Sequence, residues 1–180
     1  MVKVRGGATA KLDSKSERTR QRTLDAAAAC FRRHGFAAVT LKDIAERAGI
    51  QAGSLYYHFA SKEEIVSAVL AAGVDNAFAA TRAAVAATAK GNALERLRAA
   101  IAAHLRVVLS ENSYASANLR ILGQVPDAVR ARHLRRQREY GGFWRRLFQD
   151  AARAGAIRKD LDLSVVRMLT LGALNWSVEA

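Results

Sequence analysis

Residues 40 to 62 constrain the fold more than any other stretch, because they encode two short helices separated by a glycine turn. Thr40 can cap the first helix, with Asp43 in its acidic first turn. Apolar residues recur on one face of this helix at Leu41, Ile44, Ala45 and Ala48. Gly49 can take the left-handed conformation that ends a helix. A second helix is predicted from about Ala52 to His58, with Leu55 and Phe59 facing the core.

The outward residues of the second helix suit contact with DNA. Ala52 and Gly53 are small, so the backbone can approach base edges in the major groove. Polar groups that can reach phosphates, and so fix register, are those of Ser54, Tyr56, Tyr57, His58 and Lys62. The alternative is a small helical hairpin whose tyrosines only pack a core. The spacing of the whole stretch disfavours that alternative.

The pattern Thr-x-x-x-Ile-Ala-x-x-Ala-Gly-(5)-Leu-Tyr-x-His-Phe-x-x-Lys closely resembles the tetracycline-repressor (TetR) family of bacterial transcription regulators. The resemblance is dense from about residue 16 to residue 70. It implies that DNA is contacted by the residue that opens the first helix of the pair, by the second helix and by the lysine that follows it. The matching positions here are Thr40, Gln51, Ala52, Gly53, Ser54, Tyr56, Tyr57, His58 and Lys62. Lys42 is a further candidate for DNA binding. The small Ala52-Gly53 pair offers few base contacts of its own.

The composition favours an all-α protein. Apolar residues make up 51% of 180, there is a single proline, and no alternating Val/Ile/Thr run competes for a strand. We expect a flexible basic arm at 1–15, a helix-turn-helix DNA-binding domain at 16–60, and a helical effector-binding and dimerisation domain at 61–180. The arm either has no role or follows a DNA groove.

The charge of the chain points to a polyanionic partner. The net charge is +13, and residues 1–60 carry 11 Lys and Arg against five Asp and Glu. The single cysteine, Cys30, excludes an internal disulfide and suits a reducing cytoplasm. No apolar run reaches about 18 residues, so no membrane span is expected. Residues 1–15 lack the apolar segment of a secretory signal.

Helical periodicity and turn residues divide the rest of the chain into a succession of helices. The first helix is expected from Ser16 to His34. The later helices are expected at about 61–89, 93–110, 114–122, 127–154 and 164–180. The helix from residue 61 begins with a capping box at Ser61 and Glu64. It should connect the DNA-binding head to the body, so a shift of its far end would re-aim the head.

Two features of the body suggest an effector site. Seven arginines lie between residues 130 and 146, and arginine suits phosphate oxygens. An apolar surface from the neighbouring helices could line a cavity, although plain core is the alternative. The candidate ligand-binding residues are Leu105, Leu109, Arg135, Arg138, Phe143, Trp144 and Phe148. The segment from Leu119, and residues 171–176 above all, is similar to TetR-family repressors of fatty-acid and steroid catabolism. This similarity implies an acyl-CoA or another small hydrophobic effector.

No catalytic or metal-binding constellation is recognisable in the sequence, so neither an enzyme nor a cofactor is expected. The leading hypothesis is a cytoplasmic repressor that binds a near-palindromic double-stranded operator as a homodimer and is released by an effector. Family members usually dimerise through two late helices, of which one is clear here. The alternative is an architectural DNA-binding protein without an effector, which would show strong salt dependence and little sequence preference.

Overall fold

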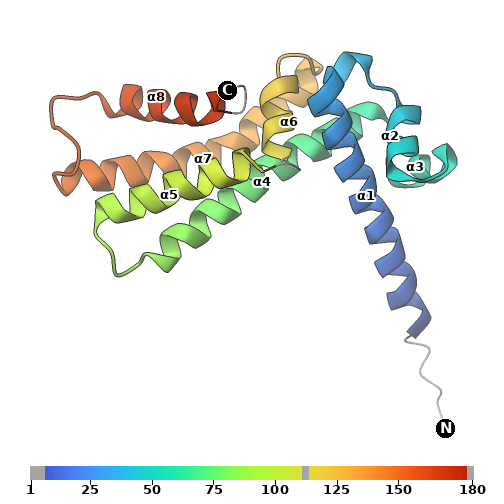
Figure 1. Cartoon of the computed structure of the whole chain (residues 1–180), viewed down its shortest axis with the longest axis horizontal. Helices are drawn as coiled ribbons and strands as arrows, with labels where there is room; N and C mark the ends of the chain where they lie inside the picture. The colour runs from blue at the N-terminus through green and yellow to red at the C-terminus, as the bar shows by residue number, and fades with distance from the viewer. Residues whose placement is uncertain (1–6, 111–113, 178–180) are drawn as a thin grey trace, which may run out of the picture.

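The computed structural model of the chain describes residues 7–110 and 114–177, with side chains from residue 15 onward. Within these ranges the chain forms α-helices and no strand, which confirms the expected all-α class (Figure 1). The helices are α1 (Gly7–Ala38), α2 (Leu41–Ala48), α3 (Ala52–His58), α4 (Lys62–Ala87), α5 (Ala93–Val108), α6 (Tyr114–Ile121), α7 (Asp127–Arg153) and α8 (Leu163–Trp176). The last residues of the predicted final helix, 178–180, lie outside the described ranges.

The first helix differs from expectation at both ends. It begins at Gly7, so most of the expected arm at 1–15 is helical, and residues 1–6 lie outside the described part of the chain. Figure 1 shows this end of α1 running well beyond the rest of the head. At the other end Gly35 has φ +77°, a left-handed backbone that breaks the helix where the sequence placed its stop. Helical structure then resumes as far as Ala38.

The two short helices form as the sequence predicts. Thr40 caps α2: its hydroxyl accepts from the Asp43 N–H at 3.2 Å, while the Asp43 carboxylate accepts from the Thr40 N–H at 2.8 Å. These hydrogen bonds lower the pKa of Asp43. Gly49 ends α2 in the left-handed conformation, with φ 62°. This turn fixes the angle between α2 and α3, and so determines which residues of α3 face outward.

The core of the head is closed by a helix of the body. Phe31, Ile44 and Leu55 are fully buried, and Ala117 and Ile121 of α6 belong to the same cluster. Each large side chain buried in this way contributes about 1.5–3 kcal/mol. A division at residue 60 therefore does not separate two independent cores, because α6 packs directly on α1.

The long helix α4 connects the two cores. Its first half buries Ile65 and Val69 in the head cluster, and its second half buries Val74 and Ala77 in the body cluster. Length and composition alone would allow α4 to cross a membrane, but here it is a core helix in contact with α1, α5, α6 and α7. At Gly73 the backbone of α6 lies so close that a Cβ would be 2.8 Å from the Tyr114 carbonyl oxygen.

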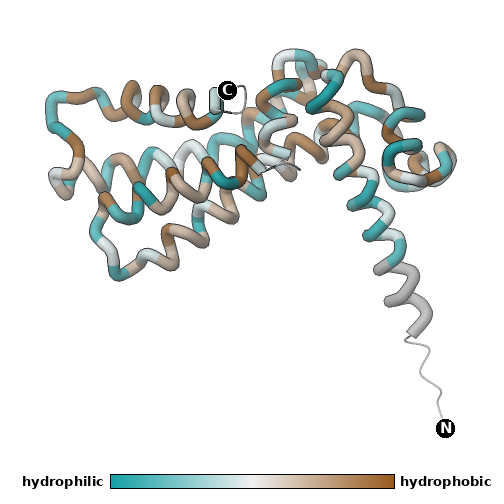
Figure 2. The backbone as a smooth tube through the Cα atoms, in the orientation of Figure 1, coloured by the Kyte–Doolittle hydropathy of each residue, from teal (hydrophilic) through white to brown (hydrophobic). Residues whose placement is uncertain are grey.

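The body consists of α4, α5 and α7 side by side, with α8 lying along α5 and α7 (Figure 1). Aromatic rings of α7 fill its centre: Trp144 and Phe148 are buried, with ring centres 6.4 Å apart. Helix α8 has no fully buried residue. Figure 2 shows it as a largely hydrophobic segment at the edge of the molecule. Three of its large apolar residues, Met168, Leu169 and Trp176, are more than 60% exposed.

Candidate DNA-binding surface and effector cavity

The outward face of α2 and α3 holds nearly all of the predicted DNA-binding residues. Thr40, Lys42 and the stretch 51–54 are exposed. Tyr56 and Tyr57 have 59% and 81% of their surface exposed, although tyrosine usually buries its ring. His58 is half-buried, and its ring centre lies 5.2 Å from that of Tyr57. Figure 1 shows α2 and α3 at the outer end of the head, so this face is available to a large partner.

Lys62 occupies a different environment from the other predicted residues. Its ammonium donates to the carbonyl oxygens of Phe36 at 2.9 Å and Val39 at 2.8 Å. It also lies 4.3 Å from the centre of the Phe36 ring. The side chain therefore ties the start of α4 to the connection between α1 and α2. A phosphate contact by Lys62 remains a prediction, and two of its three donors already have protein partners.

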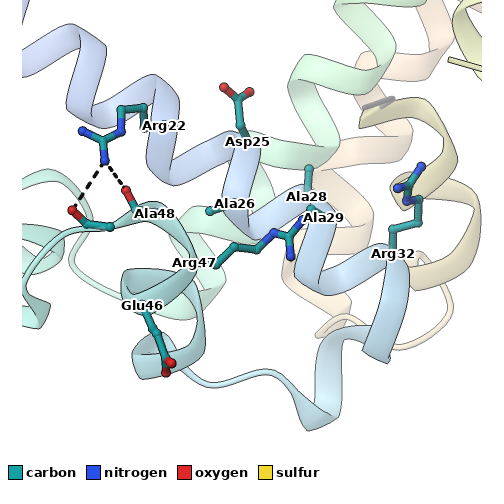
Figure 3. A pocket seen from close by; sticks show the side chains of 10 residues that line it. Arg22, Asp25, Ala26, Ala28, Ala29, Arg32, Glu46, Arg47 and Ala48 are labelled. Atoms are coloured by element: carbon teal, nitrogen blue, oxygen red, sulfur yellow. Dashed lines mark hydrogen bonds between the residues drawn. The ribbon is translucent and has the colours of Figure 1, made fainter. Parts of the chain in front are cut away.

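A hollow of about 530 Å³, which was not predicted from the sequence, lies between α1 and the end of α2. Figure 3 shows the Arg22 guanidinium reaching the end of α2, where it donates to the Ala48 carbonyl oxygen at 2.5 Å and more weakly to that of Gly49. Arg22 thus satisfies carbonyl groups that the helix end leaves free. The early arginine of α1 holds the turn between α2 and α3.

A cavity of about 250 Å³ lies in the body, among α4, α5, α6, α7 and α8. Its apolar walls include Val74, Val108 and Leu171, and its polar residues are His104, Asn118, Gln137, Tyr140 and Asn175. An open hollow of about 600 Å³ adjoins the cavity at Leu119 and Asn175, and Arg120 and Trp176 help to line it. The two spaces together offer a partly enclosed compartment beside a more open one that is lined by a cation, Arg120.

A chain of hydrogen bonds crosses one wall of the cavity and joins four helices. The Thr81 hydroxyl donates to the Ala77 carbonyl oxygen at 2.6 Å. With that proton used, the Tyr140 hydroxyl must donate to Thr81 Oγ1 at 2.8 Å, and His104 Nδ1 must donate to the Tyr140 oxygen at 2.8 Å. The Nε2 of His104 lies 3.2 Å from Oδ1 of Asn175.

The protonation state of His104 determines how it pairs with Asn175. Burial lowers the pKa of His104, which favours the neutral imidazole, and burial raises the pKa of Tyr140. A neutral ring with its proton on Nδ1 accepts at Nε2 from the amide NH₂, whereas a protonated ring donates to the amide oxygen. The wall of the cavity is thus polar, but its hydroxyl and imidazole groups are bonded to one another.

Of the seven predicted ligand-binding residues, Trp144 alone lines this cavity. Leu109, Arg135 and Arg138 are exposed, Leu105 and Phe143 are half-buried, and Phe148 is buried in the body core. The other six do not line this cavity, and a role for them in ligand binding stays a prediction. The residues of α7 that do line it are Gln137, Tyr140, Gly141 and Trp144. Their spacing of three and four residues places them on one face of α7. This face could have been recognised in the sequence, but the prediction followed the apolar residues of the helix instead.

The arginine-rich part of α7 is partly structural. The Arg136 guanidinium binds both carboxylate oxygens of Asp75, with Nε 2.8 Å from Oδ1, and Arg132 lies 3.4 Å from the Ser67 hydroxyl. Both contacts join α7 to α4. Both members of the Arg136–Asp75 pair are about half exposed, so its contribution to stability is small. The predicted phosphate-binding cluster therefore includes residues that already have protein partners.

Helix α6 binds the head as well as lining the cavity. The Tyr114 hydroxyl donates to the Asp25 carboxylate, and Gln21 Nε2 donates to the Tyr114 oxygen at 2.9 Å. Just after α6, Gln124 accepts from the Phe36 N–H at 2.9 Å. Ala115, Asn118 and Leu119 of the same short helix line the cavity. A displacement of α6 would consequently be felt in α1.

Fold and surface together define a DNA-binding regulator: a helix-turn-helix head with an exposed second helix, on a helical body that holds a partly open cavity. The family model for "Bacterial regulatory proteins, tetR family" matches residues 24–69, and that for "Tetracyclin repressor-like, C-terminal domain" matches residues 90–179. The chain belongs to the TetR family, as the sequence resemblance indicated. This family consists of transcription regulators, not enzymes.

Relatives of known name agree with this assignment. The HTH-type transcriptional repressor KstR2 of Rhodococcus jostii is 30% identical over 165 residues, which cover 85% of this chain and 76% of that protein. The match to KstR2 of Mycobacterium tuberculosis is 52% identical over 66 residues, but these span only 33% of that protein.

Solved structures extend the likeness to the whole fold. The structure of the "ketosteroid transcriptional regulator KstR2" of M. tuberculosis superposes with a TM-score of 0.76 at 31% identity, covering 89% of this chain and 81% of that one. AibR, solved with isovaleryl coenzyme A and operator DNA, has a TM-score of 0.80 at 23% identity, covering 90% and 86%. Because its sequence identity is low, the likeness to AibR shows only that the two proteins share a fold.

Proposed function

We propose that this protein is a cytoplasmic transcriptional repressor that binds a near-palindromic operator as a homodimer and leaves it when an effector fills the body cavity. The observation that carries the proposal is the double role of α6, which lines the cavity and is hydrogen-bonded to α1 of the head. The likeness to repressors named KstR2 supports it. An architectural protein without an effector is disfavoured, because a polar, partly enclosed cavity serves no purpose in such a protein.

The proposed DNA contacts lie on the exposed face of α2 and α3. Residues 51–54 would enter the major groove, while Thr40, Lys42, Tyr56, Tyr57 and His58 would bind the sugar-phosphate backbone. We assign Lys62 a positioning role, because two carbonyl oxygens hold its ammonium. In a dimer, the two heads would enter successive major grooves about 34–36 Å apart. Because the two heads are identical, the operator should be a near-palindrome.

The proposed dimer forms through α8. Val165, Met168 and Leu169 expose apolar surface along this helix, and exposed apolar patches of this kind mark protein interfaces. The dimer fixes the distance between the two heads. An effector that favours another distance would shift the population away from the DNA-bound form.

The effector we propose is an acyl-CoA. A cavity of about 250 Å³ can take a short acyl chain or a small ring system, but not a whole coenzyme. The nucleotide part would lie in the adjoining open hollow, where Arg120 offers a guanidinium to phosphate oxygens. AibR was solved with isovaleryl coenzyme A, and KstR2 is described as a ketosteroid regulator. An isovaleryl group and a steroid ring system are both apolar, and an apolar part of this kind would suit the inner cavity.

The route from cavity to head runs through α6 and α4. Asn118 of α6 donates to the Leu70 carbonyl oxygen of α4 at 2.8 Å. The other end of α4 begins at Lys62, which holds the connection between α1 and α2. An effector that moves α6 would therefore act on the head by two paths, through Tyr114 to α1 and through α4 to the base of α2.

The test is a binding assay on fragments of the protein's own promoter region at about 150 mM salt, because phosphate contacts weaken as salt rises. A panel of acyl-CoAs is then added. Sequence-selective binding that one thioester abolishes would support both parts of the proposal. Selective binding that no thioester affects would support the proposed repressor function but contradict the proposal that the effector is an acyl-CoA. Binding without selectivity would contradict the repressor.

A further inference from the structure

One acceptor in the wall of the body cavity has no partner. The Asn118 side chain is 7% exposed, and its Nδ2 donates to the Leu70 carbonyl oxygen at 2.8 Å. A carbonyl oxygen can only accept, so this contact fixes which end of the amide faces α4. The opposite atom, Oδ1, is buried without a hydrogen bond, on a residue that lines the cavity. A buried acceptor left in this state is unfavourable until a donor reaches it.

The hydroxyl and imidazole groups of the hydrogen-bonded chain beside the cavity do not supply that donor, and the Gln137 amide belongs to an exposed residue. The hydroxyl protons of Thr81 and Tyr140 and the Nδ1 proton of His104 are each committed to a neighbour in the hydrogen-bonded chain described above. The Trp144 indole N–H, in the same cavity, is also buried without a hydrogen bond. The cavity wall thus holds one buried acceptor and one buried donor without hydrogen-bond partners, beside apolar side chains, the bonded chain and the exposed Gln137.

We infer that the buried end of the effector carries a hydroxyl group that donates to Asn118 Oδ1. The inference rests on the proposed function for the location of the effector, and it narrows the ligand class to hydroxyl-bearing apolar molecules, such as the hydroxyacyl end of a thioester. A hydroxyl is small, it donates one proton, and its oxygen can accept from a group such as the Trp144 N–H. A saturated hydrocarbon chain or an unreduced ketone brings no donor, and would leave Oδ1 buried and unpaired.

Asn118 thereby becomes the residue that determines specificity. It is also the residue that joins α6 to α4, so ligand recognition and the response of the fold meet in one side chain. Asn175 provides a matched control. It lines the same cavity, but its side-chain amide lies 3.2 Å from His104 Nε2 and pairs with that ring.

The experiment uses two probes of nearly equal size and polarity, cyclohexanol and cyclohexanone, which differ in the hydroxyl proton. Their dissociation constants are measured by calorimetry on the full chain, with no coenzyme A and no DNA present. The alcohol should bind at least about tenfold more tightly to the unaltered protein, since a donor meets an unpaired acceptor. Asn118→Leu should reduce the ratio of the two constants to near one, whereas Asn175→Leu should leave it near its original value.

The outcomes separate this inference from the proposed function. Equal affinity of the two probes for the unaltered protein, or tighter binding of the ketone, would overturn the inference, even if the Asn118 variant failed to fold. Binding of neither probe at millimolar concentration would overturn it too, because a cavity of this size with an unpaired acceptor must then be closed to ligands. An acyl-CoA that fails to release DNA would discard the effector class without affecting the ratio measured here.

Discussion

The ammonium of Lys62 donates to the Phe36 carbonyl oxygen at 2.9 Å and lies over the ring of the same residue. A second carbonyl, that of Val39, accepts at 2.8 Å. The first residue of α4 therefore grips the segment that leads from α1 into the helix-turn-helix. Because α4 also forms part of the body core, this contact makes the orientation of the head depend on the body.

Lys62→Ala should lower the free energy of unfolding by about 1–2 kcal/mol, because two charge-assisted hydrogen bonds are lost from a half-buried site. Urea denaturation measures this change. Operator affinity should also fall, but with an unchanged dependence on salt, since no phosphate contact is removed. Lys42→Ala is the control: Lys42 is exposed, so stability should stay the same while the salt slope falls by about one. The reverse pattern would give Lys62 the phosphate role.

Gly53→Leu should abolish operator binding without weakening the fold. A Cβ at Gly53 would meet no atom within 4 Å, so the protein itself has room for a larger side chain. Glycine also costs a helix about 0.5–1 kcal/mol relative to alanine, so Gly53→Ala should raise the melting temperature. Circular dichroism melts and a fluorescence anisotropy titration with operator DNA measure the two effects. Full operator binding by the leucine variant would remove Gly53 from the DNA interface.

The head could be predicted from the sequence almost residue by residue, because its signals are local. The Thr40–Asp43 cap, the Gly49 turn and the Leu55 anchor each depend on neighbours within a few positions, and each forms as expected. The ends of the longer helices were less certain. The early start of α1 at Gly7 shows that glycine and polar residues do not prevent a helix from extending.

The cavity could not be predicted in the same way, because it depends on contacts between distant segments. His104, Tyr140 and Asn175 come together from three helices, and an aromatic residue such as Phe148 gives no sign in sequence of whether it faces a cavity or a solid core. The role of Lys62 was missed for the same reason, since its partners precede it by more than 20 residues. The spacing of residues within one helix can show which of them share a face, but it does not show whether that face contacts a solid core, a cavity or solvent.

Leu169→Glu should convert the dimer into monomers. Leu169 is 64% exposed on α8, and a carboxylate facing its own copy across a two-fold axis would be both desolvated and repelled. Sedimentation velocity should show the lower mass, and operator affinity should fall because a single head remains. Lys159→Glu changes charge outside α8 and should leave the dimer intact. A dimeric Leu169 variant would place the interface elsewhere.

Acidification should destabilise the protein well before its carboxylates titrate. Burial lowers the pKa of both His104 and His133 below the ordinary value of 6.5. As pH falls below about 6.5, the unfolded chain takes up protons at these positions while the folded chain does not, so the free energy of unfolding decreases. Melting temperatures between about pH 7.5 and pH 5 should fall accordingly.

His133→Leu isolates one of these contributions. Both ring nitrogens of His133 are buried without a hydrogen bond, so a leucine should be tolerated at neutral pH and should flatten the decline. An identical decline in the variant and the unaltered protein would show that His133 takes up protons equally in the folded and unfolded states, contrary to a lowered pKa in the fold.

Tyr114→Phe should uncouple effector binding from DNA release. The Tyr114 hydroxyl joins α6 to Asp25 and Gln21 of α1, but Tyr114 is not among the residues that line the cavity. The variant should therefore bind effector with unchanged affinity and operator with nearly unchanged affinity. The loss of operator affinity on adding effector should be several-fold smaller, since allosteric coupling of about 1–3 kcal/mol is shared between this contact and α4. Asp25→Asn retains an acceptor for the tyrosine and should respond normally. Calorimetry for the effector and anisotropy for the operator measure the three affinities, and an undiminished response in Tyr114→Phe would leave α4 as the sole path.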